Sequence, residues 1–360
     1  MRRSMIAVLS VVAVMLAAGA AQAGTTIEMV PVGNLGNAAD TRYETPGYGA
    51  VSYTYNIGKY EVTAGQYTAF LNAVGGVDTY GIYNSLMLTQ PGDYGCGITQ
   101  SGSGTLGDPY TYSVAAGFAN RPVNHVSFWD ACRFANWLHN GEPAGVQDAS
   151  TTEDGAYTLN GYNGADGRTI QRSAGAKWAL PSEDEWYKAA YYDPNKGGPG
   201  VPGYWDYPTM SNVAPGQDMT DASGNNANWR VPPPFSYPID APYYSTLVGE
   251  FQNSDSAYGT FDQGGNVWEW NEDIYYIEDD SWVWRIWRGG SFTCYPWPPP
   301  NPLALDLHAS YRDYSYYEQS EDYDLGFRVV QLEEGVPVPE PASLGLLGLG
   351  LLGLLRRRRA

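Results

Sequence analysis

The side chain best suited to covalent or redox chemistry in this sequence is the thiol of Cys294. It ends the run Arg288-Gly289-Gly290-Ser291-Phe292-Thr293-Cys294, so the hydroxyl of Ser291 lies three residues before the sulfur. A thiolate is a nucleophile and a ligand for soft metals, and two thiolates can hold copper(I). Cys294 is therefore a candidate catalytic residue, and an idle thiol is the alternative.

The chain has two other cysteines, Cys96 and Cys132. Cys132 falls on the apolar face of an expected helix, where buried packing is its expected role. Cys96 lies in a glycine-rich insertion, Tyr94-Gly95-Cys96-Gly97. If this insertion folds over the site, Cys96 would supply the second thiol. Three cysteines allow at most one disulfide, so stability must come from an apolar core.

Several other chemistries lack the residues that they need. The chain has three histidines (His125, His139 and His308), and no two of them have the close spacing of metal ligands. No glycine-rich phosphate loop follows an expected strand, and no G-x-S-x-G nucleophile motif occurs. The carboxylates are too numerous and scattered for a glycosidase pair to be selected.

Three helices must help to position these residues, and each begins with a capping-box pattern. Short apolar runs at 51–57, 245–251, 283–288 and 326–332 predict strands, while 75–120, 140–176 and 195–240 read as loops. We therefore expect an α+β domain with low regular secondary structure over residues 24–334. The helix caps are Thr63 with Gln66, Ser127 with Asp130, and Ser182 with Glu185.

Both ends of the chain read as targeting segments. Residues 1–23 combine two arginines, an apolar run and an Ala-x-Ala cleavage pattern, which predicts a signal peptide; a membrane anchor is the alternative. At the other end, Pro339-Glu340-Pro341 precedes the apolar run 342–355 and Arg356–Arg359. The run is short for a membrane span of about 20 residues but suffices for a transient anchor with cytoplasmic arginines.

Residues 335–360 resemble the bacterial PEP-CTERM sorting signal, and an ordinary tail anchor is the alternative. The resemblance implies export across the inner membrane, processing by an exosortase-type protease, and a final place in the cell envelope or the extracellular matrix. Six of the 20 basic residues and one of the 39 acidic residues lie in the two end segments. The remainder carries 14 basic and 38 acidic residues, a net charge of −24. Such a charge argues against nucleic acid or anionic lipid partners and leaves carboxylates available for calcium.

Six blocks in a fixed order resemble the sulfatase-modifying-factor family, whose best-known members oxidise a substrate cysteine to formylglycine. The resemblance implies one modified C-type-lectin-like domain with a copper(I) site made by two cysteines and assisted by a serine. Cys294 and Ser291 match the first cysteine and the serine, but the second cysteine is replaced by Pro299. The blocks are Lys59–Thr63, Arg121–Ser127, Leu180–Trp186, Gly265–Trp270, Arg288–Cys294 and Leu325–Arg328.

The same resemblance implies two calcium sites that hold long loops in place. Carboxylate and carbonyl oxygens are the ligands that calcium prefers, and glycine lets backbone carbonyls turn inward. The alternative is that Asp262 and Glu269 cap or pair within the fold. The second site would use Asp262, Gly265, Val267 and Glu269, and the first would use Asn228, Trp229, Asp240 and Pro242.

A group of aromatic residues between positions 274 and 323 suggests contact with a ligand. Tyr and Trp side chains suit peptide or carbohydrate binding, and the alternative is that they fill the core. The group comprises Tyr275, Tyr276, Trp282, Trp284, Trp287, Tyr295, Trp297, Tyr311, Tyr314, Tyr316, Tyr317 and Tyr323.

Two functions follow from these patterns. The first is a non-catalytic module that binds a peptide or a carbohydrate in an aromatic cleft. The second is a copper-dependent oxidase that acts on a sulfatase cysteine through Cys294. Because Pro299 removes the second thiol, we predict the binding module.

Overall fold

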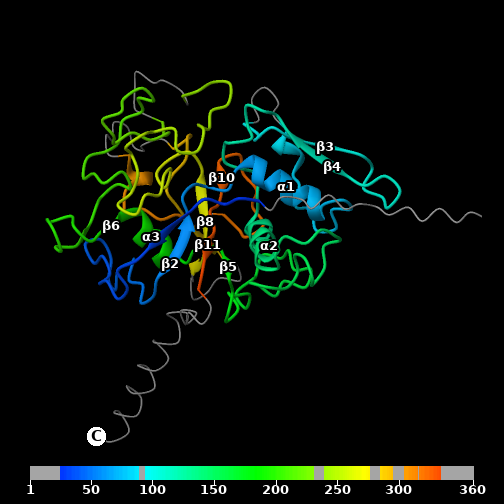
Figure 1. The fold of residues 1–360 in the computed structure, drawn as a ribbon, viewed down its shortest axis with the longest axis horizontal. Helices are drawn as coiled ribbons and strands as arrows, with labels where there is room; N and C mark the ends of the chain where they lie inside the picture. The colour runs from blue at the N-terminus through cyan, green and yellow to red at the C-terminus, as the bar shows by residue number, and fades with distance from the viewer. Residues whose placement is uncertain are drawn as a thin grey trace, which may run out of the picture.

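The computed structural model describes residues 25–88, 94–230, 239–275, 284–294, 304–314 and 316–333. The predicted signal peptide and the predicted sorting segment lie outside these residues. Within them, short strands and three helices are joined by long irregular connections, as Figure 1 shows.

The three predicted helices are confirmed. In each of them, both hydrogen bonds of the capping box are present, which fixes the first turn with a contribution of about 1 kcal/mol. In the first, the hydroxyl of Thr63 accepts from the amide of Gln66 at 3.2 Å, and the side chain of Gln66 accepts from the amide of Thr63 at 2.8 Å. The helices are α1 (Ala64–Val74), α2 (Phe128–His139) and α3 (Glu183–Tyr191), with 3-10 turns η1 (Ser85–Met87) and η2 (Leu305–Leu307).

The strands form four small sheets. One has the order β1-β2-β11-β5 and another the order β10-β8-β9, and the pairs β3-β4 and β6-β7 form hairpins. In Figure 1, β2, β11 and β5 lie side by side near the middle of the molecule, with α2 and α3 on opposite sides of them. The strands are β1 (Met29–Val32), β2 (Tyr55–Gly58), β3 (Ile98–Ser101), β4 (Thr111–Val114), β5 (Trp178–Ala179), β6 (Tyr192–Asp193), β7 (Gly203–Tyr204), β8 (Trp268–Tyr275), β9 (Trp284–Arg288), β10 (Leu325–Gly326) and β11 (Val330–Gln331).

Three of the four predicted strands correspond to observed ones, in the regions of β2, β9 and β10–β11. The prediction of a strand at 245–251 is wrong. The chain turns there at Gly249, whose φ is +74°, and the amide of Gly249 donates to the carboxylate of Asp262 at 2.6 Å instead of to a neighbouring strand. The loop prediction for 75–120 is also incomplete, because this region contains η1 and the β3–β4 hairpin.

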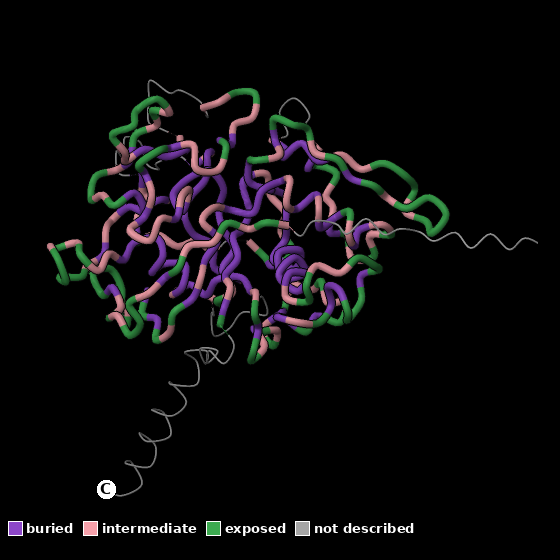
Figure 2. The backbone as a smooth tube through the Cα atoms, viewed as in Figure 1, coloured by how far each residue is buried: buried purple, intermediate pink, exposed green. Residues whose placement is uncertain are grey.

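The core lies where the helices meet the central strands. Figure 2 shows it as the purple, buried segments in the middle of the molecule. Aromatic rings build much of it: Phe70 of α1 contacts Phe134 and Trp137 of α2 at centroid distances of 5.4 Å. Trp129, Trp137, Trp186 and Trp270 are among its largest buried side chains. None of the helices in the described ranges has the length and apolar character that a membrane span requires.

Candidate functional site around Cys294

The loop that carries Cys294 begins at the end of β9 with two glycines in the left-handed region. Gly289 and Gly290 have φ values of +98° and +76°, and a Cβ on Gly290 would lie 2.6 Å from the side chain of Leu307. Glycine is therefore required for the chain to turn so close to η2. The amide of Phe292 then donates to the carbonyl of Asn266 at 2.9 Å, which ties the loop to the turn before β8.

The structure brings Ser291 and Cys294 together, as their spacing predicts. The sulfur of Cys294 accepts a hydrogen bond from the amide of Ser291 at 3.0 Å, and the two side chains lie 3.4 Å apart. The hydroxyl of Ser291 also donates to the carboxylate of Asp324 at 2.6 Å, and the hydroxyl of Thr293 donates to the same oxygen at 2.7 Å. Asp324 thus organises the loop around the sulfur.

The electrostatic environment of Cys294 favours the neutral thiol. Burial raises the pKa of Cys294 well above its ordinary value, and the carboxylates of Asp306 and Asp324 raise it further. Asp306 lies in η2 and has a raised pKa itself, because it is also buried. Reactive thiolates usually have basic neighbours, whereas this sulfur has acidic ones. At neutral pH the side chain is therefore a poor nucleophile and a poor metal ligand.

The other two cysteines are free and buried, like Cys294 itself. Cys132 lies on α2, with Arg285, Glu272 and Glu318 among the charged groups around it. The pKa of Cys96 rises to about 11 because of burial. Both thiols therefore sit in the interior, and Pro299 lies outside the described residues.

The insertion before β3 contacts the Cys294 loop through Tyr94. The ring of Tyr94 lies 5.8 Å from that of Phe292, 5.4 Å from that of Tyr323 and 4.9 Å from that of Tyr244. The insertion thus approaches the site with an aromatic ring, while the side chain of Cys96 is buried in the core.

Around the predicted second calcium site, the carboxylate of Glu269 is held by other side chains. Its two oxygens accept from the guanidinium of Arg328 at 2.6 and 2.7 Å, and one also accepts from the indole of Trp186 at 2.7 Å. Asp262 accepts from the amide of Gly249, and burial raises its pKa to about 6. The pairing of Glu269 matches the alternative in which the carboxylates of this loop pair within the fold.

A third carboxylate, that of Glu61, lies beside Asp262 and Glu269. Burial raises the pKa of Glu61 well above its ordinary value, and the charges of Asp262 and Glu269 raise it further. The side-chain amide of Asn266 donates to Glu61 at 3.2 Å. Burial and the neighbouring carboxylates therefore favour the neutral form of Glu61, while the charge of Glu269 is offset by Arg328.

The residues of the predicted first calcium site lie next to the second. The carbonyl of Asn228 accepts from the amide of Asn266 at 2.8 Å, and a Cβ on Gly265 would meet that carbonyl oxygen at 2.2 Å. The side-chain amide of Asn228 donates to the carbonyl of Tyr244, and Trp229 is buried beside it. The side-chain oxygen of Asn228 is buried and has no hydrogen-bond partner among the described residues.

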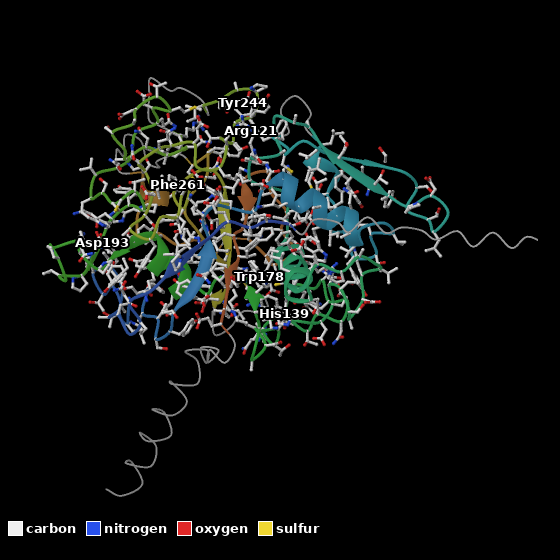
Figure 3. The ribbon with its side chains drawn as sticks, in the orientation of Figure 1. Arg121, His139, Trp178, Asp193, Tyr244 and Phe261 are labelled. Carbon is white, nitrogen blue, oxygen red and sulfur yellow. The ribbon has the colours of Figure 1, made fainter. Side chains whose placement is uncertain are left out.

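Such an orphaned amide oxygen suits a calcium ligand, since calcium prefers uncharged and charged oxygen donors alike. Asp240, by contrast, pairs with Arg121 at 2.7 Å, and Pro242 follows it in the same loop. Figure 3 labels Arg121 and Tyr244, which lie close together in this region. Across the described ranges, no group of three or more His, Cys, Asp and Glu side chains is arranged to hold a metal. The residues of the first site fit calcium through Asn228; in the second, Glu269 is already engaged.

Many of the predicted ligand-binding aromatics stack on each other. Tyr275 and Tyr314 are parallel at a centroid distance of 3.7 Å, and Trp284 lies 5.7 Å from Tyr314 on nearly parallel planes. Trp287 stacks on Tyr316 at 4.8 Å. The remaining described members are Tyr311, Tyr317 and Tyr323, whereas Tyr276, Trp282, Tyr295 and Trp297 lie outside the described residues.

Comparison with protein families matches residues 13–332 to the model of the sulfatase-modifying factor enzyme 1-like domain. The match spans most of the sequence and includes the loop of Cys294. The chain belongs to this family. The match begins within the predicted signal peptide and ends at Leu332, the residue after β11. Together with the observed short strands and three helices, it confirms the predicted α+β domain with little regular secondary structure.

A second family model, the PEP-CTERM protein-sorting motif, matches residues 337–359. This match confirms the resemblance at the C-terminal end and indicates export and sorting to the cell envelope. It also implies recognition by an exosortase-type processing system. The predicted signal peptide remains a prediction.

Among solved structures, the family domain is similar to CarF, with 20% identity, coverage of 86% of this chain and 100% of that chain, and a TM-score of 0.47. Treponema denticola variable protein 1 has 20% identity, covers 84% of this chain and 94% of its own, and has a TM-score of 0.48. PvdO from Pseudomonas aeruginosa has 18% identity, coverage of 87% and 100%, and a TM-score of 0.43. No curated protein matches the chain.

Several residues that shape the site were not predicted to have a role. Asp306 and Asp324 flank the sulfur of Cys294 but come from distant segments with no motif of their own that marks them. Glu61 and Arg328 lie in two of the blocks that carry the family resemblance, and this was their only signal. Their partners were not predictable, because Glu61 and Arg328 each contact side chains that are distant in the sequence.

Proposed function

We propose that this family member is an exported protein that binds a ligand and does not oxidise cysteine. The observation that carries the proposal is the acidic, buried setting of Cys294 between Asp306 and Asp324, which raises the pKa of the thiol. A copper(I) site needs thiolates, and the position of the family's second cysteine holds Pro299. The sorting motif supports a location at the cell envelope, and an exopolysaccharide matrix is part of our proposal.

The half-buried and exposed rings of this group, those of Tyr275, Trp284, Tyr314 and Tyr317, are the ligand surface that we propose, while Trp287 is buried in the core. Stacked rings hold one another rigid, so they offer fixed edges at a low entropy cost. Tyr317 is 41% exposed, and Tyr275 and Trp284 are half-buried. A peptide or a carbohydrate is the class of ligand that such a surface suits.

The alternative is the copper-dependent oxidase, which the retained Arg288–Cys294 block favours. In that case Cys294 would hold copper(I), which supplies oxygen activation, and the hydroxyl of Ser291 would lie beside the sulfur. The carboxylate of Asp324 would keep that hydroxyl oriented.

A turnover assay separates the two functions. The full chain is supplied with copper(I), oxygen and a cysteine-containing peptide with a sulfatase motif, with Cys294→Ala measured in parallel. We expect no aldehyde from either protein when circular dichroism shows that both are folded. Aldehyde from the wild type alone would establish the oxidase and overturn the proposal.

We also propose calcium as a structural ligand, with the side-chain oxygen of Asn228 as its best-supported contact. The carbonyl of Trp229, Asp240 and the carbonyl of Pro242 would complete the first site. Asp262, with the carbonyls of Gly265 and Val267, would supply the second, where Glu269 contributes only if it leaves Arg328. Calcium would hold the loops before β8 in place.

A further inference from the structure

An open groove of about 730 Å³ lies at the start of α1, far along the chain from Cys294. The segment before β1 forms one side of it and the loop 247–252 forms another. In Figure 1, α1 is the helix next to β10. The lining residues that decide its chemistry include Ile27, Glu28, Glu61, Ala69, Leu247 and Glu250.

The charge of the groove has one sign. Three carboxylates line it and no Lys, Arg or His does, within the part of the chain that the structure describes. Glu28 is paired with Lys59 at 2.7 Å, so its charge is partly offset. Glu250 makes no ion pair with the described residues, and Glu61 lies buried in the lining. Glu250 is therefore the carboxylate of this groove whose charge is not offset by the described residues.

The carboxylate of Glu61 is weakly satisfied for a buried group. It accepts from Asn266 at 3.2 Å and from the amide of Val267 at 3.4 Å, both near the upper limit for such bonds. A buried carboxylate normally has shorter, stronger partners. Burial also raises the pKa of Glu61, so this residue adds little charge to the groove, and Glu250 supplies the charge.

The rest of the lining is apolar or aromatic. Ile27, Ala69 and Val248 contribute aliphatic surface, and Leu247 is 39% exposed, which is high for a leucine. Tyr60 is fixed against the opposite side, since a Cβ on Gly249 would lie 2.6 Å from its ring. Apolar walls beside unpaired carboxylates suit the aliphatic stem and charged head of a lysine or arginine side chain.

We infer that this groove binds a basic, partly apolar segment of a polypeptide partner. A Lys or Arg head group faces Glu250, and an apolar neighbour packs on Ile27 and Leu247. Charge complementarity selects this partner, and the volume is that of a site for a few side chains. The site is independent of the proposed aromatic surface, because the two share no residues.

Peptide binding to the full chain, with calcium present throughout, tests this inference. The probe is a fluorescently labelled Lys-Leu-Lys-Leu-Lys peptide with blocked ends, and the comparison peptide is Gln-Leu-Gln-Leu-Gln. We expect Glu250→Gln to weaken binding of the lysine peptide about five-fold, as removal of a partly exposed charge contact does. Asp108→Asn removes the same charge from an exposed loop and should leave the affinity unchanged.

A second variant tests the walls of the groove without changing charge. Ala69→Trp fills the space beside α1 and should abolish binding while the protein remains folded. Equal weakening by Glu250→Gln and Asp108→Asn would mean attraction to net charge and would overturn the inference. It would also be overturned if spermidine displaced the peptide at the same charge concentration, or if the glutamine peptide bound equally well.

Discussion

At the scale of single residues, the fold depends on buried charges that are paired across the chain. Arg328 and Glu269 are both fully buried, and their side chains meet in a two-point ion pair. Arg328 also donates to the carbonyls of Gly58 and Phe261, so its guanidinium joins β2 to the turn before β8. Removal of one partner leaves the other charge in the interior without a counterion.

Replacement of Arg328 by Met should therefore destabilise the protein by about 3–5 kcal/mol, as loss of one member of a buried pair does. Arg168→Met is the matched control, because its pair with Asp166 is exposed and should contribute less than about 1 kcal/mol. Urea unfolding of the two variants measures the difference. Adding Glu269→Gln to the Arg328→Met variant should restore part of the loss. Equal stabilities for the two single variants would contradict the prediction.

Lys188 of α3 is the opposite case, a buried cation whose amine donates to the carbonyl of Asn34 at 3.0 Å. Burial lowers the pKa of Lys188 from its ordinary value of 10.5 to about 8. Between these two pH values Lys188 is more often protonated in the unfolded chain than in the folded protein. The free energy of unfolding therefore rises with pH across this window. Lys188→Met should therefore be more stable than the wild type at pH 7.

The advantage of Lys188→Met should shrink between pH 8 and pH 10.5. Urea unfolding of the wild type and of Lys188→Met at a series of pH values checks this. Any tyrosine that loses its proton in the same pH range should change the stability of both proteins alike. An advantage that does not change with pH would mean that packing, and not charge, sets the difference.

At the scale of elements, glycines fix the turns that bring the candidate ligands together. Gly265 and Gly175 have nearly the same backbone conformation, with φ values of +86° and +84°. A Cβ on Gly265 would meet the carbonyl oxygen of Asn228 at 2.2 Å, whereas a Cβ on Gly175 would have open space around it. The two positions thus separate backbone strain from steric overlap.

We expect Gly175→Ala to cost about 1–2 kcal/mol from the left-handed conformation alone. Gly265→Ala should cost clearly more, because the Asn228 segment must also move. Thermal unfolding of the two variants gives the comparison. Similar losses would show that the segment of Asn228 yields without cost.

The elements that could be predicted are those with local signals. The three capped helices were predictable because each cap and its partner lie three residues apart. Strand β8 was not predicted, since its first residues, Trp268 and Glu269, follow or belong to the predicted calcium loop. The prediction of a strand at 245–251 was wrong because the residue types of this run carry no information about the turn at Gly249.

The same distinction holds for the candidate site. Ser291 and Cys294 are close in sequence, and their contact was predictable. Asp306 and Asp324, which set the charge around the sulfur, are brought there only by the fold. A sequence motif therefore indicated the thiol but not its protonation state.

At the scale of the whole molecule, long irregular connections need more than a core to hold them. Ordering such segments costs conformational entropy, and a bound ion that fixes two loops offsets it. Asn228 and Gly265 lie in contact although 36 residues separate them in the chain. The proposed calcium would therefore act on the fold as a whole.

Addition of a calcium chelator should lower the melting temperature of the wild type by several degrees, since a ligand that binds only the folded state stabilises it. Asn228→Ala should be less stable and should respond less to the chelator, because only the second site remains. Asn72→Ala is the control, because Asn72 lies on α1 and its side chain bonds to the hairpin strand β4. A chelator response in Asn228→Ala as large as that of the wild type would argue against this residue as a ligand.

The position of β11 has a mechanical consequence. This strand is the last element before the sorting motif, and it is an interior strand, with β2 on one side and β5 on the other. A pull on the C-terminal end, such as a membrane tether would exert, must break hydrogen bonds to two neighbours together. A tether at this end would thus act on the domain at a point that resists peeling, and traction during sorting should leave the folded domain intact.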